Sequence, residues 1–98
     1  MNLPDEETLD RMETLLSVAS DSTRLKILYC LIGQEKNVSQ LVEEVGASQS
    51  LISHQLQVLR KAHLVSTRKD GTKVFYLLAD DHVSSLLSVV YAHATEAK

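Results

Sequence analysis

The sequence predicts a mainly α-helical protein that carries one small β-hairpin. Aliphatic residues dominate the apolar side chains, since the chain has one Phe, three Tyr and no Trp. Apolar residues recur at helical spacing through most of the 98 residues, and the spacing changes to that of strands only in residues 64–78. A chain of this length supports one modest core, so residues 1–98 are expected to form a single domain.

The first two helices are predicted from their apolar faces. The second helix begins at Asp21 or Ser22 and ends near Gly33. It contains Cys30, the only cysteine, which is expected to be a buried structural thiol rather than a reactive one. The first helix covers residues 5–18, with an apolar face made of Leu9, Met12, Leu15 and Leu16.

Two further helices are expected to follow a loop at residues 34–37. Residues 38–45 form the shorter helix, and Gly46 is the turn residue because it takes positive φ without strain. Ser48 is a suitable N-cap for the next helix, which runs from Gln49 to about Ala62. Its apolar positions are Leu51, Ile52, Leu56, Val58 and Leu59.

A β-hairpin and a last helix complete the prediction. Residues 64–69 and 73–78 are rich in β-branched and aromatic residues, and Asp70-Gly71-Thr72 between them is a hairpin signal. Residues 80–96 contain no Pro or Gly and predict one helix. Two helices joined by a short Gly turn and followed by a basic hairpin are the order of a winged helix-turn-helix.

The helix after the turn has a polar face suited to reading base edges. Ser and Gln side chains donate and accept hydrogen bonds in the major groove, and Gln pairs with adenine through two bonds. The alternative is that these residues only coat an exposed helix. The predicted DNA-contacting residues of this segment are Ser48, Gln49, Ser50, Ser53, His54 and Gln57.

Charge is distributed unevenly along the chain, whose formal net charge is −3. Residues 1–20 contain five acidic residues against one Arg, whereas residues 48–76 contain five basic residues against Asp70 alone. A basic segment in an acidic protein suits local contact with an anion. In the hairpin, Arg68, Lys69 and Lys73 are therefore expected to contact phosphate, with solvated charges as the alternative.

The last helix carries two halves of a candidate metal site. His82 and His93 are eleven residues apart, so they lie within roughly 20° of each other around the helix axis but about 16 Å apart along it. A zinc ligand must come within about 2 Å of the metal, so one helix cannot close the site. An antiparallel copy would place Asp80 and His82 against His93 and Glu96 of its partner, giving two equivalent sites with two imidazoles and two carboxylates each.

The same residues have a simpler interpretation. Asp80 is a good N-cap, Asp81 complements the helix dipole, and His93 and Glu96 are compatible with full solvation.

Taken together, the chain resembles the ArsR/SmtB family of metal-sensing repressors. The resemblance rests on Ser48–Leu56, on Leu59–Val65, on the hairpin Arg68–Leu77 and on Ala19–Leu28. It implies a homodimer with the first and last helices at the interface, binding to an inverted-repeat operator on double-stranded DNA, and release from DNA when metal binds.

The resemblance also implies which residues bind the metal. In its zinc-sensing branch the last helix has Asp-x-His near the start and His-x-x-His or His-x-x-Glu near the end, which correspond to Asp80, His82, His93 and Glu96. The branch with cysteine ligands is not matched, because residues 37–40 contain no thiol. Zinc is the expected regulatory ligand, with cobalt or nickel as alternatives. The family further implies a hydrogen bond from His93 to the backbone carbonyl of His63.

The expected function is therefore a zinc-responsive transcriptional repressor, with a metal-independent DNA-binding regulator as the alternative. An enzyme is not expected, since four protein ligands would close the zinc shell and no nucleophile–base set is present. The chain has no apolar run long enough for a membrane span, and its acidic N-terminus lacks the pattern of an export signal. A cytoplasmic location is the resulting expectation.

Overall fold

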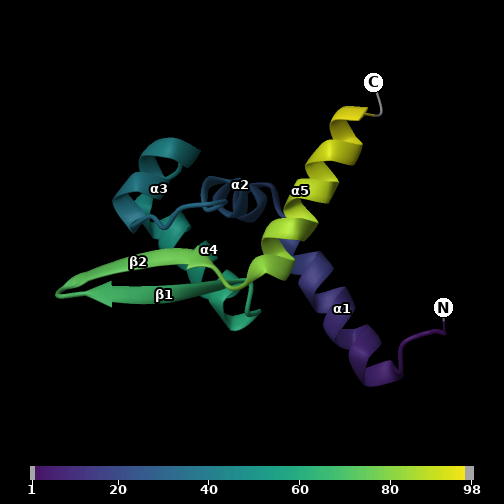
Figure 1. Ribbon diagram of the computed structural model, residues 1–98. Helices are drawn as coiled ribbons and strands as arrows, with labels where there is room; N and C mark the ends of the chain where they lie inside the picture. The colour runs from purple at the N-terminus through teal and green to yellow at the C-terminus, as the bar shows by residue number, and fades with distance from the viewer. Residues whose placement is uncertain (1, 97–98) are drawn as a thin grey trace.

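The computed structural model describes residues 2–96 and has five helices and a two-stranded antiparallel hairpin within them. In Figure 1, α1 and α5 extend from one side of the body and the hairpin extends from the other. The predicted fold class is confirmed. The elements are α1 (Glu6–Ala19), α2 (Ser22–Cys30), α3 (Val38–Val45), α4 (Gln49–Lys61), β1 (Val65–Asp70), β2 (Lys73–Leu78) and α5 (Asp81–Glu96).

Local capping signals set most helix boundaries. Asp5, Asp21 and Ser48 each accept a hydrogen bond from a backbone N–H three residues ahead, at the start of α1, α2 and α4. Asn37 and Gln40 form a reciprocal capping box at the start of α3. The α2 helix ends at Cys30, three residues before the predicted boundary, and a short turn follows.

The core lies where α2, α3 and α4 meet. Its members are aliphatic, so dispersion and burial of apolar area hold these three helices against one another. The side chains with the least exposure are Ile27, Leu28, Leu31, Leu41, Ile52, Leu56 and Leu59.

A polar contact that sequence reasoning missed joins α1, α2 and α4. Arg24 of α2 donates from Nε to the carbonyl of Val18 at 2.6 Å and from Nη1 to Oε1 of Gln55 at 2.7 Å. Gln55 is only 9% exposed, although its amide would ordinarily prefer water. The guanidinium therefore satisfies a buried side chain of α4 and fixes the end of α1 at the same time.

The hairpin has a two-residue turn, and its second strand also pairs with a residue outside the hairpin. Asp70 pairs with Lys73, so only Gly71 and Thr72 form the turn, with φ of +64° at Gly71. The predicted loop at residues 34–37 forms a β-bridge with the outer edge of β2. There the Lys36 N–H donates to the Tyr76 carbonyl at 2.9 Å, and the Tyr76 N–H donates to the Lys36 carbonyl at 2.7 Å.

The apolar faces of α1 and α5 are largely uncovered within one chain. No residue of α1 is buried, and in α5 only Val83 and Leu87 are. The predicted apolar face of the first helix therefore exists, but among residues 2–96 only its end, at Val18 and Ala19, packs against the core. Its exposed members, and those of the last helix, are Leu9, Met12, Leu15, Leu16, Leu86, Val89, Val90 and Tyr91.

Tyr29 adds a polar and an aromatic contact to the attachment of α5, beside the buried side chains of Val83 and Leu87. Its hydroxyl donates to the carbonyl of Leu87 at 2.7 Å, and its ring lies 6.3 Å from the ring of Tyr91, centroid to centroid.

Among residues 2–96, no helix has the length and apolar character needed to cross a membrane.

Replacing Arg24 with Lys is expected to lower the free energy of unfolding by about 1–3 kcal/mol, because an ammonium lacks the fork that reaches both acceptors. Urea unfolding at fixed protein concentration measures this, with Lys26→Ala on the exposed side of α2 as the control. Equal unfolding midpoints for Arg24→Lys and the wild-type protein would show that the contact contributes nothing.

Candidate nucleic-acid interface and metal ligands

The helix α4 presents one apolar and one polar face. Gly46, in the left-handed conformation with φ of +76°, ends α3, and Ser48 then opens α4 two residues later. Ile52, Leu56 and Leu59 are fully buried on the inner face. The predicted DNA-contacting residues lie away from this face: Gln49, Ser50, His54 and Gln57 are exposed, and Ser53 is half-buried.

Two of the α4 assignments are refined by the structure. The Ser48 hydroxyl oxygen accepts a hydrogen bond from the Leu51 N–H at 3.1 Å, so this side chain is already used as the N-cap. Leu51, predicted as an apolar core position, is 39% exposed. Gln55 takes the inward position instead, because Arg24 satisfies its amide oxygen.

The hairpin places three cations near its tip, but they differ in their surroundings. Lys69 and Lys73 are exposed, and no ion pair forms at either among residues 2–96. Arg68, by contrast, donates from Nε to both oxygens of Glu35, at 2.9 and 3.1 Å, and from Nη2 to Oε1. The guanidinium also lies 5.1 Å from the centre of the Phe75 ring. Phosphate contact stays a prediction for all three residues. Among residues 2–96, Arg68 is already held by Glu35, whereas Lys69 and Lys73 are not held by an ion pair.

The Glu35–Arg68 pair changes the acidity of both groups. Hydrogen bonding from Arg68 lowers the pKa of Glu35, and hydrogen bonding from Glu35 raises the pKa of Arg68 above its ordinary value. Since the pKa of Glu35 is depressed, the pair stabilises the fold above the ordinary Glu pKa and loses this contribution as the pH falls through the depressed value.

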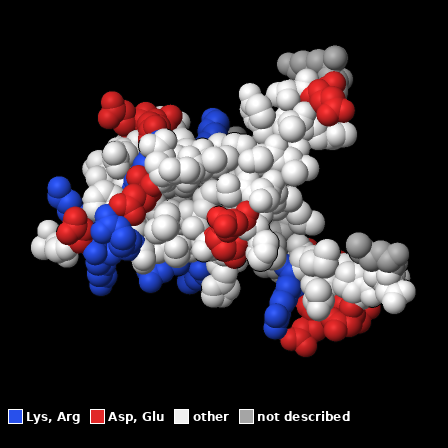
Figure 2. Space-filling view, viewed as in Figure 1, with Lys and Arg blue, Asp and Glu red and all other residues white. Residues whose placement is uncertain are grey.

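Figure 2 shows how charge is arranged on this side of the molecule. Lys and Arg side chains gather around the hairpin and along the edge beneath it, with some acidic side chains among them, and further acidic side chains lie over α3, in the middle of this face, on the N-terminal part of α1 and at the far end of α5. The basic side chains are thus densest at the hairpin, where an anionic duplex would be met, whereas α3 carries the exposed Glu43 and Glu44.

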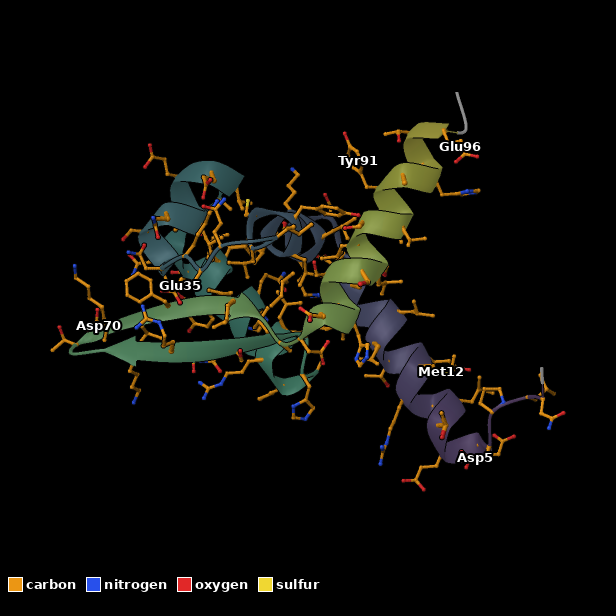
Figure 3. All side chains as sticks on the ribbon, viewed as in Figure 1. Asp5, Met12, Glu35, Asp70, Tyr91 and Glu96 are labelled. Carbon is orange, nitrogen blue, oxygen red and sulfur yellow. The ribbon has the colours of Figure 1, made fainter. Side chains whose placement is uncertain are left out.

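The predicted metal ligands lie at opposite ends of α5. Asp80 precedes the helix, and its Oδ1 accepts hydrogen bonds from the N–H groups of His82, at 2.9 Å, and Val83, at 3.2 Å. The same oxygen is 3.7 Å from Nδ1 of His82, whose imidazole is 98% exposed. His93 and Glu96 are exposed in the last turns, and Figure 3 labels Glu96 at the far end of the helix.

One chain alone does not assemble these ligands. Within residues 2–96, no three His, Cys, Asp or Glu side chains are close enough to hold a metal ion together. The donor set nevertheless fits zinc, because two imidazoles and two carboxylates are available and none of the four residues is buried. Asp80 and His82 border a cavity of about 790 Å³ between α1, α5 and the α4–β1 junction, to which His63 also contributes.

The lone thiol is a different case. Cys30 is half-buried against the core, and burial raises its pKa. A thiol that stays protonated is a poor nucleophile and a poor metal ligand, which favours the structural role predicted for it.

Fold and surface together define a winged helix-turn-helix regulator of transcription. The family model "Bacterial regulatory protein, arsR family" matches residues 21–67. The chain is 37% identical over 97 residues to the transcriptional repressor SmtB homolog of Synechocystis, covering 96% of this chain and 74% of that protein. The chain therefore belongs to the ArsR family.

Two further comparisons agree with this assignment. The HTH-type transcriptional regulator KmtR of Mycobacterium tuberculosis is 40% identical over 85 residues, covering 87% of this chain but only 65% of that protein. The chain thus spans slightly less than two thirds of that relative. The homodimeric winged helix-turn-helix DNA-binding domain of Mb0332 from Mycobacterium bovis superposes with a TM-score of 0.88 at 27% identity, covering 99% and 93% of the two chains.

Replacing Lys69 or Lys73 with Ala is expected to weaken DNA binding equally on specific and unrelated duplexes, because a phosphate contact carries no sequence information. The slope of log affinity against log salt should fall by about 1 for each lysine. Fluorescence anisotropy across a salt series measures both quantities, with Arg11→Ala on α1 as the control cation. A slope identical to that of the wild-type protein would mean that these lysines are only solvated.

Proposed function

We propose that the chain is a zinc-responsive transcriptional repressor that binds an inverted-repeat operator as an apo homodimer and leaves it when zinc binds between subunits. The observation that carries this proposal is the coincidence of two features on α5. The helix has an uncovered apolar face, and the two halves of a four-ligand set lie at its opposite ends.

The apolar faces support a dimer built on α1 and α5. Leu86 is 45% exposed and Val89 is 66% exposed, while Leu9 and Leu15 of α1 are 37% and 38% exposed. Both helices lie on the same side of the body, opposite the hairpin (Figure 1), so a second copy would cover them without obstructing the DNA-reading surface. The homodimeric state of the Mb0332 domain supports a dimer for this chain.

Zinc at such sites would tie the α5 helices of the two subunits together. The free energy by which zinc weakens DNA binding would equal the difference in zinc-binding free energy between the DNA-binding and non-binding forms of the dimer. His63, in the junction between α4 and β1, would transmit this effect: it holds a left-handed backbone, with φ of +61°, where the chain passes from the helix to the hairpin. Within one chain His93 lies at the other end of α5 from His63, so a hydrogen bond to the His63 carbonyl would have to come from the partner subunit's His93, which would connect the metal ligands to this junction.

A metal-independent regulator is the second candidate, and one observation favours it. Asp80 already satisfies two backbone N–H groups as the cap of α5, which would account for its presence without any metal.

Replacing His93 with Ala is expected to abolish zinc-driven release while leaving apo DNA binding unchanged, because the substitution removes a ligand far from α4. Anisotropy on a duplex from the region upstream of the chain's own coding sequence, first with chelator and then with zinc, measures both states. Asp81→Asn is the matched control, since it removes a neighbouring carboxylate that is outside the proposed ligand set.

Titration with cobalt gives an independent readout. A four-ligand tetrahedral site produces visible absorption bands in the wild-type protein and in Asp81→Asn, and His93→Ala should lose them. If His93→Ala still released DNA on zinc addition, the ligand set would be wrong. If zinc left the wild-type complex unchanged, the metal-independent candidate would replace it.

A further inference from the structure

The hairpin needs support from the rest of the chain to be a defined DNA-contacting element. It projects well beyond the core (Figure 1), and its tip around Gly71 is exposed. A two-stranded hairpin is at best marginally stable by itself in water. Phosphate contacts by Lys69 and Lys73 depend on where the hairpin points, so the contacts that fix its direction also affect binding.

Residues 35–36, in the segment between α2 and α3, supply such contacts. The backbone of Lys36 pairs with Tyr76 through two hydrogen bonds and so acts as a one-residue third strand on β2. The Lys36 side chain is buried, and its Nζ lies 2.5 Å from Oε1 of Glu44 on α3. The bridge to the hairpin is thereby anchored to a helix of the body.

Glu35 adds a second contact, farther toward the tip. Its carboxylate receives Nε and Nη2 of Arg68, a fork geometry that fixes the guanidinium plane as well as its position. Arg68 is the cross-strand partner of Phe75 and lies over its ring, so both strands are held by the one pair. Figure 3 shows Glu35 between α3 and β2, on the body side of the hairpin.

Strand geometry separates this contact from Lys69, whereas Lys73, two residues from Phe75, lies on the same face as Arg68. Successive side chains of a strand point to opposite faces, so Lys69 lies on the face of β1 opposite Arg68 and Glu35. The pair is partly shielded, with Glu35 34% exposed and Arg68 48% exposed at their side chains. Glu35 therefore pairs with Arg68 and leaves the Lys69 side chain exposed to solvent.

We infer that Glu35 is a positioning residue for DNA binding: this carboxylate strengthens the affinity for duplex DNA by holding the hairpin through Arg68. The inference rests on the proposed DNA-binding function and adds a residue to it. Its consequence runs against simple electrostatics, since removing a negative charge next to a basic surface would ordinarily tighten the binding of an anion.

Glu35→Gln is the decisive variant, because Gln has a similar shape but no charge to hold the guanidinium. We expect its affinity for a fluorescein-labelled duplex from the chain's own upstream region to fall about two- to fivefold, the range that a partly exposed ion pair supports. Glu43→Gln is the matched control: it removes the same charge from an exposed position on α3. For this control we expect equal or slightly tighter binding.

Arg68→Gln and the double variant distinguish positioning from direct phosphate contact. If the pair acts as a unit, the double variant binds no more weakly than either single variant, and the salt slope stays that of the wild-type protein. Tighter binding by Glu35→Gln would overturn the inference, and so would a slope reduced by about 1 in Arg68→Gln, because either result would make Arg68 a phosphate ligand that Glu35 competes for.

Hydrogen exchange keeps failure of the inference distinct from failure of the proposed function. In the absence of DNA, Glu35→Gln should speed exchange of the β1 and β2 amides while leaving the α2 and α4 core unchanged. Unchanged hairpin exchange would overturn the inference even if DNA binding is confirmed. A wild-type chain that binds no duplex would remove the proposed function, and with it a role for Glu35 in DNA affinity, whatever the exchange shows.

Discussion

The Arg24 guanidinium is the contact on which the placement of the DNA-reading helix depends. Apolar packing brings α2 and α4 together, but aliphatic side chains allow small rotations and shifts at little cost. Hydrogen bonds to Val18 and Gln55 are directional and remove this freedom. Because Arg24 reaches α1 and α4 together, the orientation of the reading face is tied to that of the helix that carries the uncovered apolar surface.

The parts of the fold predicted from sequence are those with short-range causes. A cap at Asp5, Asn37 or Ser48 acts over three residues, and the turns at Gly46 and Gly71 depend on their own backbone angles. These signals were sufficient to predict five helices and the hairpin with boundaries close to those observed. Periodicity likewise indicated the inner face of α4 correctly at its three fully buried leucine and isoleucine positions.

The missed features join residues far apart in sequence, where no local pattern specifies a partner. Arg24 and Gln55 are 31 residues apart, Glu35 and Arg68 are 33 apart, and Tyr29 bonds to a carbonyl 58 residues away. From sequence alone, a Gln on a helix or a Glu in a loop is predicted to be solvated, because no local pattern specifies its distant partner. The metal ligands present a related difficulty, since their predicted arrangement needs a second chain and residues 2–96 of one chain leave it untested.

The separation of charge along the chain has a consequence for how quickly, and in which orientation, the protein meets its target. The acidic N-terminal part of α1 and the exposed lysines of the hairpin lie at opposite ends of one chain, whose net charge is −3. In a dimer joined through α1 and α5 the acidic helices would lie at the centre and the hairpins at the two outer ends, so a polyanion would be attracted at the hairpins and repelled between them. Encounters in which the duplex meets the acidic centre would therefore end sooner than those in which it meets a hairpin.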